Sequence, residues 1–198
     1  MTTPVTARDR AKAERTDAIL RAAAQLFALR GYSGVSLEEI GTAVGVSGPA
    51  VYRHFSGKQA LLGAVLIKVS LDLVEGGRAV AASVADDEER MRELIRFHVG
   101  FALGNPDVIR VQDRDLPHLS EEDGAQVRRL QREYIDIWIA ALAPVQPVAQ
   151  DELRLRVQAC FGLINSTPHS TRQAMRSKGT TAAVLASMAY AALIARAG

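Results

Sequence analysis

The sequence SLEEIGTAVGVSGPAVYRHF, residues 36–55, decides the fold of the N-terminal part of the chain. Ser36 followed three residues later by Glu39 is a capping box, the signature of a helix start. Gly45 stands where the chain must turn sharply, and Ser47 caps a second helix with Pro49 in its first turn, where a missing N–H costs nothing. Two short helices joined by a tight turn predict a helix-turn-helix unit.

Apolar residues of this stretch have the spacing needed to pack in the angle between the two helices: Leu37, Ile40, Val46, Val51 and Phe55. The residues left outward on the second helix are small or can form hydrogen bonds. These are Gly48, Pro49, Ala50, Tyr52, Arg53 and His54. A helix with small residues at its N-terminus can approach base edges in the major groove, so the pattern indicates DNA binding.

Helical periodicity also dominates on both sides of this unit. A helix is expected over about residues 8–30, ended by Gly31, and a long helix is expected to begin near Lys58. Further helices are expected at about 86–103, 107–114, 120–142, 151–165 and 181–196, with a loop at 115–119 and a break near Pro168. No segment alternates as a strand does. The sequence therefore predicts an all-α fold of about nine helices.

Composition sets the broad class. The chain has 198 residues, is 48% hydrophobic and 23% charged, and has one cysteine, which excludes an internal disulfide framework. Residues 1–60 carry 8 Lys and Arg against 5 Asp and Glu, which indicates a basic N-terminal part that meets a polyanion. We find no signal peptide and no membrane span, so we expect a cytoplasmic protein. We also expect no cofactor.

These residues together resemble the DNA-binding domain of TetR-type repressors over about residues 15–62. The match rests on Gly31-Tyr32-x-Gly34-x-Ser36, on Glu39-Ile40-x-x-x-Val44-Gly45-Val46-Ser47, and on Tyr52-x-His54-Phe55-x-x-Lys58-x-x-Leu61-Leu62. The resemblance implies a homodimer that binds a palindromic DNA operator and is released by a small-molecule effector. It implies an N-terminal arm and helix-turn-helix domain over residues 1–57 and a helical ligand-binding and dimerisation domain over 58–198.

The resemblance also implies roles for particular residues. Tyr52, His54 and Lys58 are expected to contact phosphates, and Ser36 often adds a hydroxyl or an amide. The expected base-facing group is Ser47, Gly48, Pro49 and Ala50, with Arg53. The family often has Thr or Ser where this chain has Ala50, so direct base readout is expected to be sparse. The basic arm residues Arg8, Arg10, Lys12 and Arg15 either reach DNA or are simply solvated.

Aromatic and polar residues of the C-terminal part are candidates for an effector cavity, with core packing as the alternative for each: Phe97, His98, Phe101, Gln112, Arg114, Tyr134, Trp138 and Asn165. If the arginines near residues 105–119 point inward, an acyl-CoA thioester would suit the site. Dimer contacts are expected from apolar faces of the last two helices: Leu153, Val157, Phe161 and Ile164, then Val184, Met188, Ala191 and Ala192.

The rival hypothesis is a small helical metabolite-binding protein or enzyme whose basic N-terminal part is incidental. Cys160 lies on an apolar helix, where a cysteine is usually a small buried hydrophobe rather than a nucleophile. His98, His118 and His169 lack the spacing of metal ligands, and no catalytic constellation is evident. The sequence therefore favours a regulator with no catalytic and no metal site.

Overall fold

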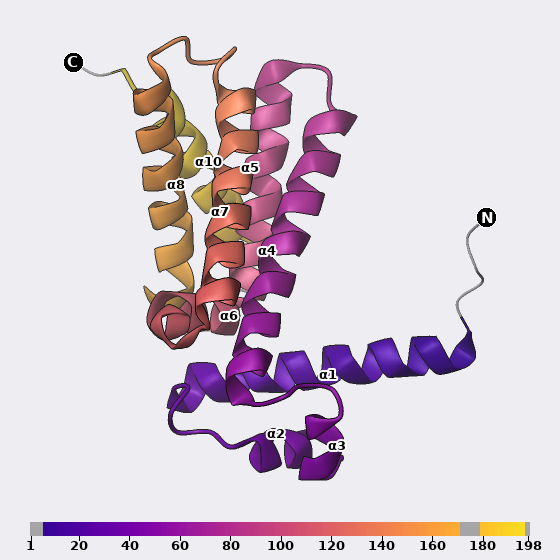
Figure 1. The fold of residues 1–198 in the computed structure, drawn as a ribbon. Helices are drawn as coiled ribbons and strands as arrows, with labels where there is room; N and C mark the ends of the chain where they lie inside the picture. Colours follow the sequence, from indigo (N-terminus) through magenta and orange to yellow (C-terminus); the bar gives the residue numbers. More distant parts are fainter. Residues whose placement is uncertain (1–5, 171–178, 197–198) are drawn as a thin grey trace.

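The computed structural model describes residues 6–170 and 179–196, and within these ranges the chain is helical and contains no strand (Figure 1). The elements are α1 Ala7–Arg30, α2 Leu37–Ala43, α3 Gly48–Tyr52, α4 Lys58–Ser83, α5 Asp87–Gly104, α6 Pro106–Asp115, the short 3-10 helix η1 Leu116–His118, α7 Glu121–Leu142, α8 Gln150–Ser170 and α10 Gly179–Ile194. The all-α prediction is confirmed.

The first three helices form a small unit beneath the longer helices, with α1 lying across it (Figure 1). Its core contains the fully buried side chains of Phe27, Ile40 and Val51, to which the start of α4 adds Leu61 and Leu62. The apolar residues that the helix-turn-helix pattern placed inward are therefore the ones that hold this unit together.

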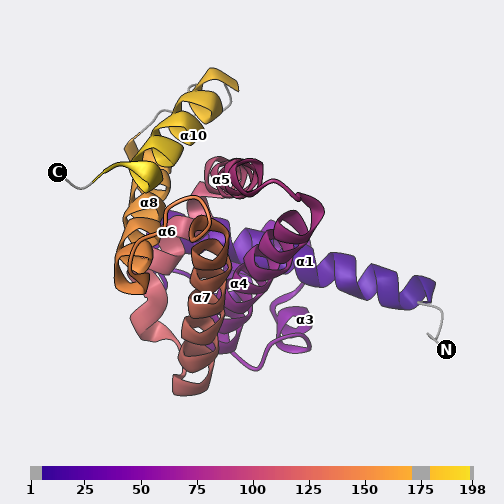
Figure 2. The same cartoon turned by 90° about the horizontal axis from the view of Figure 1, so that it is seen from above.

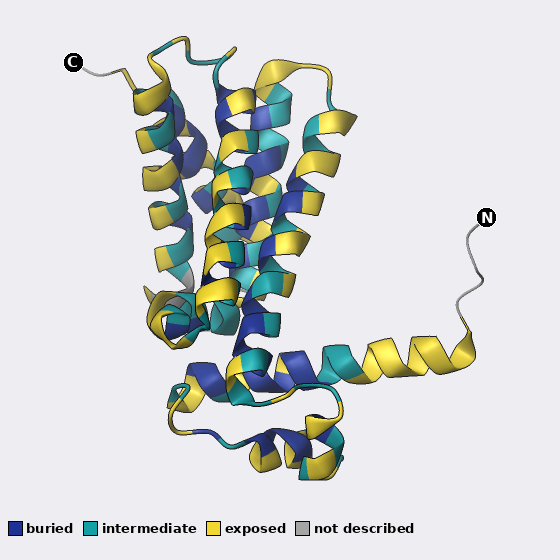
Figure 3. Ribbon diagram, viewed as in Figure 1, coloured by how far each residue is buried: buried dark blue, intermediate teal, exposed yellow. Residues whose placement is uncertain are grey.

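The remaining long helices run side by side as a bundle, as both views show (Figures 1 and 2). Trp138, Leu94 and Met91 are fully buried in its core, while the outer faces are exposed (Figure 3). α4 packs closely on α7, and Gly77 makes this possible. A Cβ atom at Gly77 would stand 2.7 Å from Cε2 of Tyr134.

α4 continues through Gly76 and Gly77 to Ser83, and these two glycines leave room for Phe97 and Tyr134. Two local expectations need correction. Residues 115–119 are not an open loop, since η1 occupies their centre. α8 does not end at about Asn165 but continues to Ser170.

The division at residues 57 and 58 stays a prediction, and α4, which begins at Lys58, contributes side chains to both cores. The first turns of α4 pack in the N-terminal core, whereas Val74 belongs to the core of the bundle. No helix in the described part of the chain is both long and apolar enough to cross a membrane.

Candidate nucleic-acid interface and internal cavity

The start of α2 is built as the sequence predicts. The amide of Glu39 donates to Oγ of Ser36 at 3.2 Å, and the amide of Ser36 donates to Oε2 of Glu39 at 2.8 Å. Arg30 at the end of α1 pairs with the same carboxylate at 2.8 Å. The Arg30 hydrogen bond and the Ser36 amide lower the pKa of Glu39 to about 2. The cap thus ties α2 to α1.

The turn between α2 and α3 depends on two glycines. Gly45 has a φ of 71°, which other residues rarely adopt, as its position predicts. Gly41 was not singled out from the sequence, yet a Cβ atom there would stand 2.9 Å from the carbonyl oxygen of Val46 and 3.1 Å from Cγ2 of Val51. The helices can approach this closely only because position 41 has no side chain.

α3 presents to solvent the residues expected to face DNA. Val51 is fully buried and fixes the helix on the core, while Ser47, Pro49 and Arg53 are exposed. Tyr52 is 52% exposed, an unusual position for a large aromatic side chain. Gly48 and Ala50 are half-buried. Ser47 makes no side-chain cap bond, so its hydroxyl stays available to a ligand.

Three of the four expected phosphate contacts surround one shallow depression of about 540 Å³, which Ser36, Tyr52 and Lys58 line together. Nζ of Lys58 donates to the carbonyl oxygen of Val35 at 2.9 Å and lies 4.5 Å from the ring centre of Tyr32. The start of α4 has no side-chain cap, so its first amides are free to bind an anion.

His54 lies apart from this depression. Its Nδ1 is 3.1 Å from Oγ1 of Thr16 on α1, and the ring is half-buried. The basic residues Arg8, Arg10, Lys12 and Arg15 belong to the exposed first turns of α1, which extend beyond the rest of the molecule (Figure 1). They are therefore carried on a helix rather than on a loose arm.

An internal cavity of about 260 Å³ lies within the bundle, between α4, α5, α6, α7 and α8. Five of the eight residues expected to bind a ligand line it: His98, Phe101, Gln112, Tyr134 and Asn165. The other lining residues are Ser70, Leu73, Val108, Ile109, Leu130, Gln131, Ile135 and Phe161.

His98 is at the centre of a hydrogen-bonded chain beside this cavity. Nδ1 of His98 is 3.3 Å from the hydroxyl of Tyr134, and Nε2 is 3.2 Å from Oδ1 of Asn165. Because burial lowers the pKa of His98 to about 4, the ring is neutral. The assignment that satisfies all three groups has Tyr134 donating to Nδ1 and Nε2 donating to Asn165.

The other three residues expected to bind a ligand do not line the cavity. Phe97 packs against Gly76 of α4. Trp138 is fully buried behind the lining, with its ring 4.8 Å from that of Phe161, and its Nε1 is buried without a hydrogen-bond partner among the described residues. The helical periodicity of the sequence correctly predicted that the rings of Phe97 and Trp138 face inward. It could not show whether an inward ring lines the cavity or packs in the core.

Arg114 points away from the cavity and holds the bundle to α1. Its guanidinium binds both oxygens of the buried Asp115 at 2.9 Å and donates to the carbonyl oxygens of Phe27 and Ala28. Beside it, the ring of His118 stacks on Tyr32 at 4.7 Å, and Nε2 of Gln59 donates to the carbonyl oxygen of His118 at 3.0 Å. α6 and η1 thus connect the cavity to the N-terminal unit.

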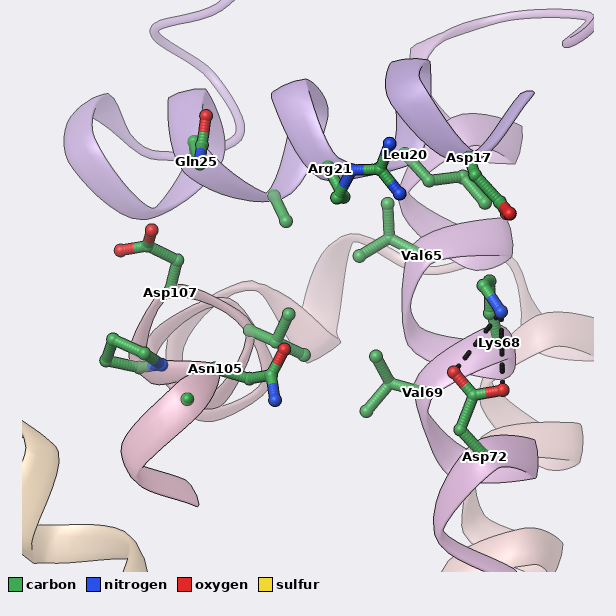
Figure 4. A pocket seen from close by; sticks show the side chains of 14 residues that line it. Asp17, Leu20, Arg21, Gln25, Val65, Lys68, Val69, Asp72, Asn105 and Asp107 are labelled. Atoms are coloured by element: carbon green, nitrogen blue, oxygen red, sulfur yellow. Dashed lines mark hydrogen bonds and ion pairs between the residues drawn. The ribbon is translucent and has the colours of Figure 1, made fainter. Parts of the chain in front are cut away.

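A second, more polar cavity of about 400 Å³ lies where α1, α4 and the start of α6 meet (Figure 4). Lys68 binds Asp72 on one side of it, and Asp107 faces it from the other side. No residue from the predicted ligand set lines this cavity. Only Val108 lines both cavities, so a change at α6 affects each.

The residues expected at the dimer face are exposed on α10 but not on α8, and the dimer contact itself stays a prediction. Val184, Met188, Ala191 and Ala192 of α10 are exposed, as expected. On α8, however, Leu153, Val157 and Ile164 are buried in the core and Phe161 lines the cavity. Leu155 of α8 is a large apolar residue that is exposed instead, at 64%.

The described residues give little support for a nucleophilic cysteine or for a metal site. Burial raises the pKa of the Cys160 thiol to about 12, so it is a poor nucleophile. Within the described ranges, no group of three or more His, Cys, Asp and Glu side chains is placed to hold a metal ion. His169 lies where side chains are not described.

A helix-turn-helix unit with an exposed recognition face, joined to a helical bundle with an internal cavity, defines a ligand-sensing DNA-binding regulator. Comparison with known proteins identifies the family to which this regulator belongs. Residues 19–65 match the family model described as bacterial regulatory proteins of the tetR family, and residues 84–169 match the tetracyclin repressor-like C-terminal domain. Together these matches cover more than half of the chain, which therefore belongs to the TetR family of transcriptional regulators.

Individual relatives agree with this assignment. The transcriptional activator FasR of Mycolicibacterium smegmatis is 36% identical over 88 residues, which are 44% of this chain and 40% of FasR. The transcriptional repressor NicS of Pseudomonas putida is 25% identical over 76% of this chain and 70% of its own length. A TetR-family regulator from Bordetella parapertussis, 24% identical, has the same fold, with a TM-score of 0.80 over 91% of this chain and 94% of that one.

Proposed function

We propose that this chain is an effector-responsive repressor that binds a palindromic operator as a homodimer. The observation that carries the proposal is the depression in which Ser36, Tyr52 and Lys58 meet at the uncapped start of α4, next to the exposed face of α3. Hydroxyl groups, a cation and free amides are the donors that fix a protein on phosphates, while Pro49, Ala50 and Arg53 are free to approach bases.

The dimer is proposed on the exposed apolar faces of α8 and α10. Leu155, Val184 and Met188 are all more than half exposed, and a hollow of about 500 Å³ lies between the two helices, lined in part by Val184 and Met188. Exposed apolar surface of this kind is characteristic of contact sites. Because α3 lies at one end of the bundle (Figure 1), a two-fold axis beside this face and parallel to the long helices would place two copies of α3 at the same end of the dimer, as a palindromic operator requires.

The internal cavity is proposed as the effector site. It combines aromatic and aliphatic side chains with a few uncharged polar groups inside the bundle, as small-molecule sites do, whereas the larger cavity beside α1 is lined by several charged side chains. Val108, Ile109 and Gln112 of α6 line it, and Arg114 at the other end of α6 holds α1. An effector that prefers a shifted position of α6 therefore moves the DNA-binding unit.

Repression is proposed because the relative NicS is a transcriptional repressor, with release by the effector as the signal. A metabolite-binding protein without DNA affinity remains the rival. Selection from random duplex DNA decides between them. We expect an enriched inverted repeat whose half-sites lie on one face of the duplex, at multiples of about 10–10.5 base pairs. Failure of the full-length protein to enrich any sequence would contradict the proposal.

A further inference from the structure

The lining of the internal cavity carries information about the effector, if the cavity is the effector site proposed above. Every lining side chain in the described ranges is uncharged at neutral pH, since His98 is held neutral by burial. Arg114, the cation that the sequence offered for this site, instead binds Asp115 and donates to a carbonyl oxygen of α1. A ligand that enters between these walls meets no counter-charge from them.

Four of the lining residues in the described ranges have aromatic rings: His98, Phe101, Tyr134 and Phe161. The rings of Tyr134 and Phe161 are nearly parallel, at 7° and with centres 5.5 Å apart. His98 lies 4.6 Å from Phe161, and Phe101 lies 6.0 Å from His98 on the same helix. Such walls favour a flat ring, which can stack on or lie edge-on to its neighbours.

The cavity also supplies hydrogen-bond donors at a defined place. Both ring nitrogens of His98 are engaged, so His98 positions Asn165 rather than offering a group of its own. Because Oδ1 of Asn165 accepts from His98, its amide nitrogen is the group left to donate, and it has no partner among the described residues. Gln112 likewise has no described partner.

Charge and size restrict the ligand further. Moving a carboxylate or a phosphate from water to such walls without a cation is strongly unfavourable. An engineered apolar cavity of about 150 Å³ in another protein holds benzene, so about 260 Å³ suits a compound of one or two rings.

We propose that the effector is a compact, uncharged compound with a flat aromatic ring and a carbonyl or hydroxyl oxygen that accepts a hydrogen bond from Asn165. Acyl-CoA thioesters, which the sequence suggested, carry several negative charges and are the main competing class. Aromatic carboxylates are the other.

Three probes of matched shape and one thioester test the proposal by thermal shift and by Trp138 fluorescence. Acetophenone is the neutral ketone, benzoate is its charged counterpart, cumene is the hydrocarbon of the same shape, and butyryl-CoA represents the thioesters. We expect acetophenone to bind the wild-type protein at least about tenfold more tightly than benzoate or butyryl-CoA. Tighter binding of benzoate or butyryl-CoA, or no binding of acetophenone, would overturn the proposal.

Two variants test the role of Asn165. Asn165→Asp keeps the acceptor for His98 but removes the donor, so acetophenone affinity should fall at least about tenfold while cumene affinity changes little. Gln158→Glu makes the same change from amide to carboxylate at an exposed position of α8, outside the internal cavity, and should alter neither affinity. The retained binding of cumene shows that the variant is folded. Equal losses for both ligands would contradict a specific hydrogen bond.

Operator binding separates this inference from the proposed function. If the selected operator binds and benzoate or butyryl-CoA releases it better than acetophenone does, the ligand class is wrong and the proposed function stands. If no operator is enriched although acetophenone binds, the ligand class stands and the proposed function is wrong.

Discussion

The connection between α6 and α1 depends on the side chain of Arg114. Arg114 neutralises Asp115, which is only 2% exposed, and also donates to the carbonyl oxygens of Phe27 and Ala28. Arg114→Met leaves the Asp115 carboxylate buried and unpaired and leaves the last turn of α1 without its donor. Removing one partner of a buried pair costs about 3–5 kcal/mol. Because the Arg114 side chain is 43% exposed and water reaches it, we expect a loss near the lower limit, about 3 kcal/mol.

The double variant Arg114→Met/Asp115→Asn is the matched control, since it removes the stranded charge together with the cation. We expect it to recover most of the loss, to within about 1 kcal/mol of the wild type. Urea unfolding followed by the fluorescence of the buried Trp138 measures both free energies of unfolding. Equal losses in the single and double variants would refute the view that the buried charge causes the cost.

The same pair tests transmission between the cavity and DNA. The double variant keeps the cavity lining but lacks the donor that holds α1. Any compound that weakens operator binding of the wild type should therefore weaken it less in the double variant. The operator affinity measured without the compound, divided by the affinity measured with it, should be closer to one in the double variant than in the wild type. A wild-type ratio in the double variant would show that Arg114 does not transmit the signal.

Three further outcomes are expected. Burial lowers the pKa of His98 from 6.5 to about 4, so between these pH values the unfolded chain binds a proton that the folded chain does not. The free energy of unfolding should therefore fall by up to about 3 kcal/mol as the pH drops from about 6.5 to about 4. Urea titrations of His98→Gln should lack this fall. Gly41→Ala should cost about 1–3 kcal/mol and weaken operator binding, because its Cβ crowds Val46; unchanged melting and affinity would contradict this. Met188→Glu should convert a dimer to a monomer in sedimentation at micromolar concentration, and a persistent dimer would place the interface elsewhere.

The sequence predicted the local features well because they depend on neighbouring residues. The capping box of Ser36 and Glu39, the turn at Gly45 and the start of α4 at Lys58 are set within a few residues, and each is found in the structure. The inward position of Val51 follows from the same short pattern. Periodicity over one or two turns is enough for such features.

Features that depend on which helices pack together could not be predicted in this way. α8 is apolar on more than one side, so periodicity could not show that Leu153 and Val157 face the core while Leu155 faces outward. Phe101 and Trp138 looked equivalent, yet only Phe101 reaches the cavity. The role of Arg114 required the position of α6 against α1, which no short stretch of sequence encodes.

Lys58 provides the most direct test of the central claim that this surface binds DNA. Operator affinity of the wild type and of Lys58→Ala can be measured by fluorescence anisotropy over a series of salt concentrations. We expect weaker binding by the variant. We also expect the slope of log affinity against log salt concentration to be reduced by about one for each subunit, because one phosphate contact is lost. Unchanged affinity and an unchanged slope would contradict it.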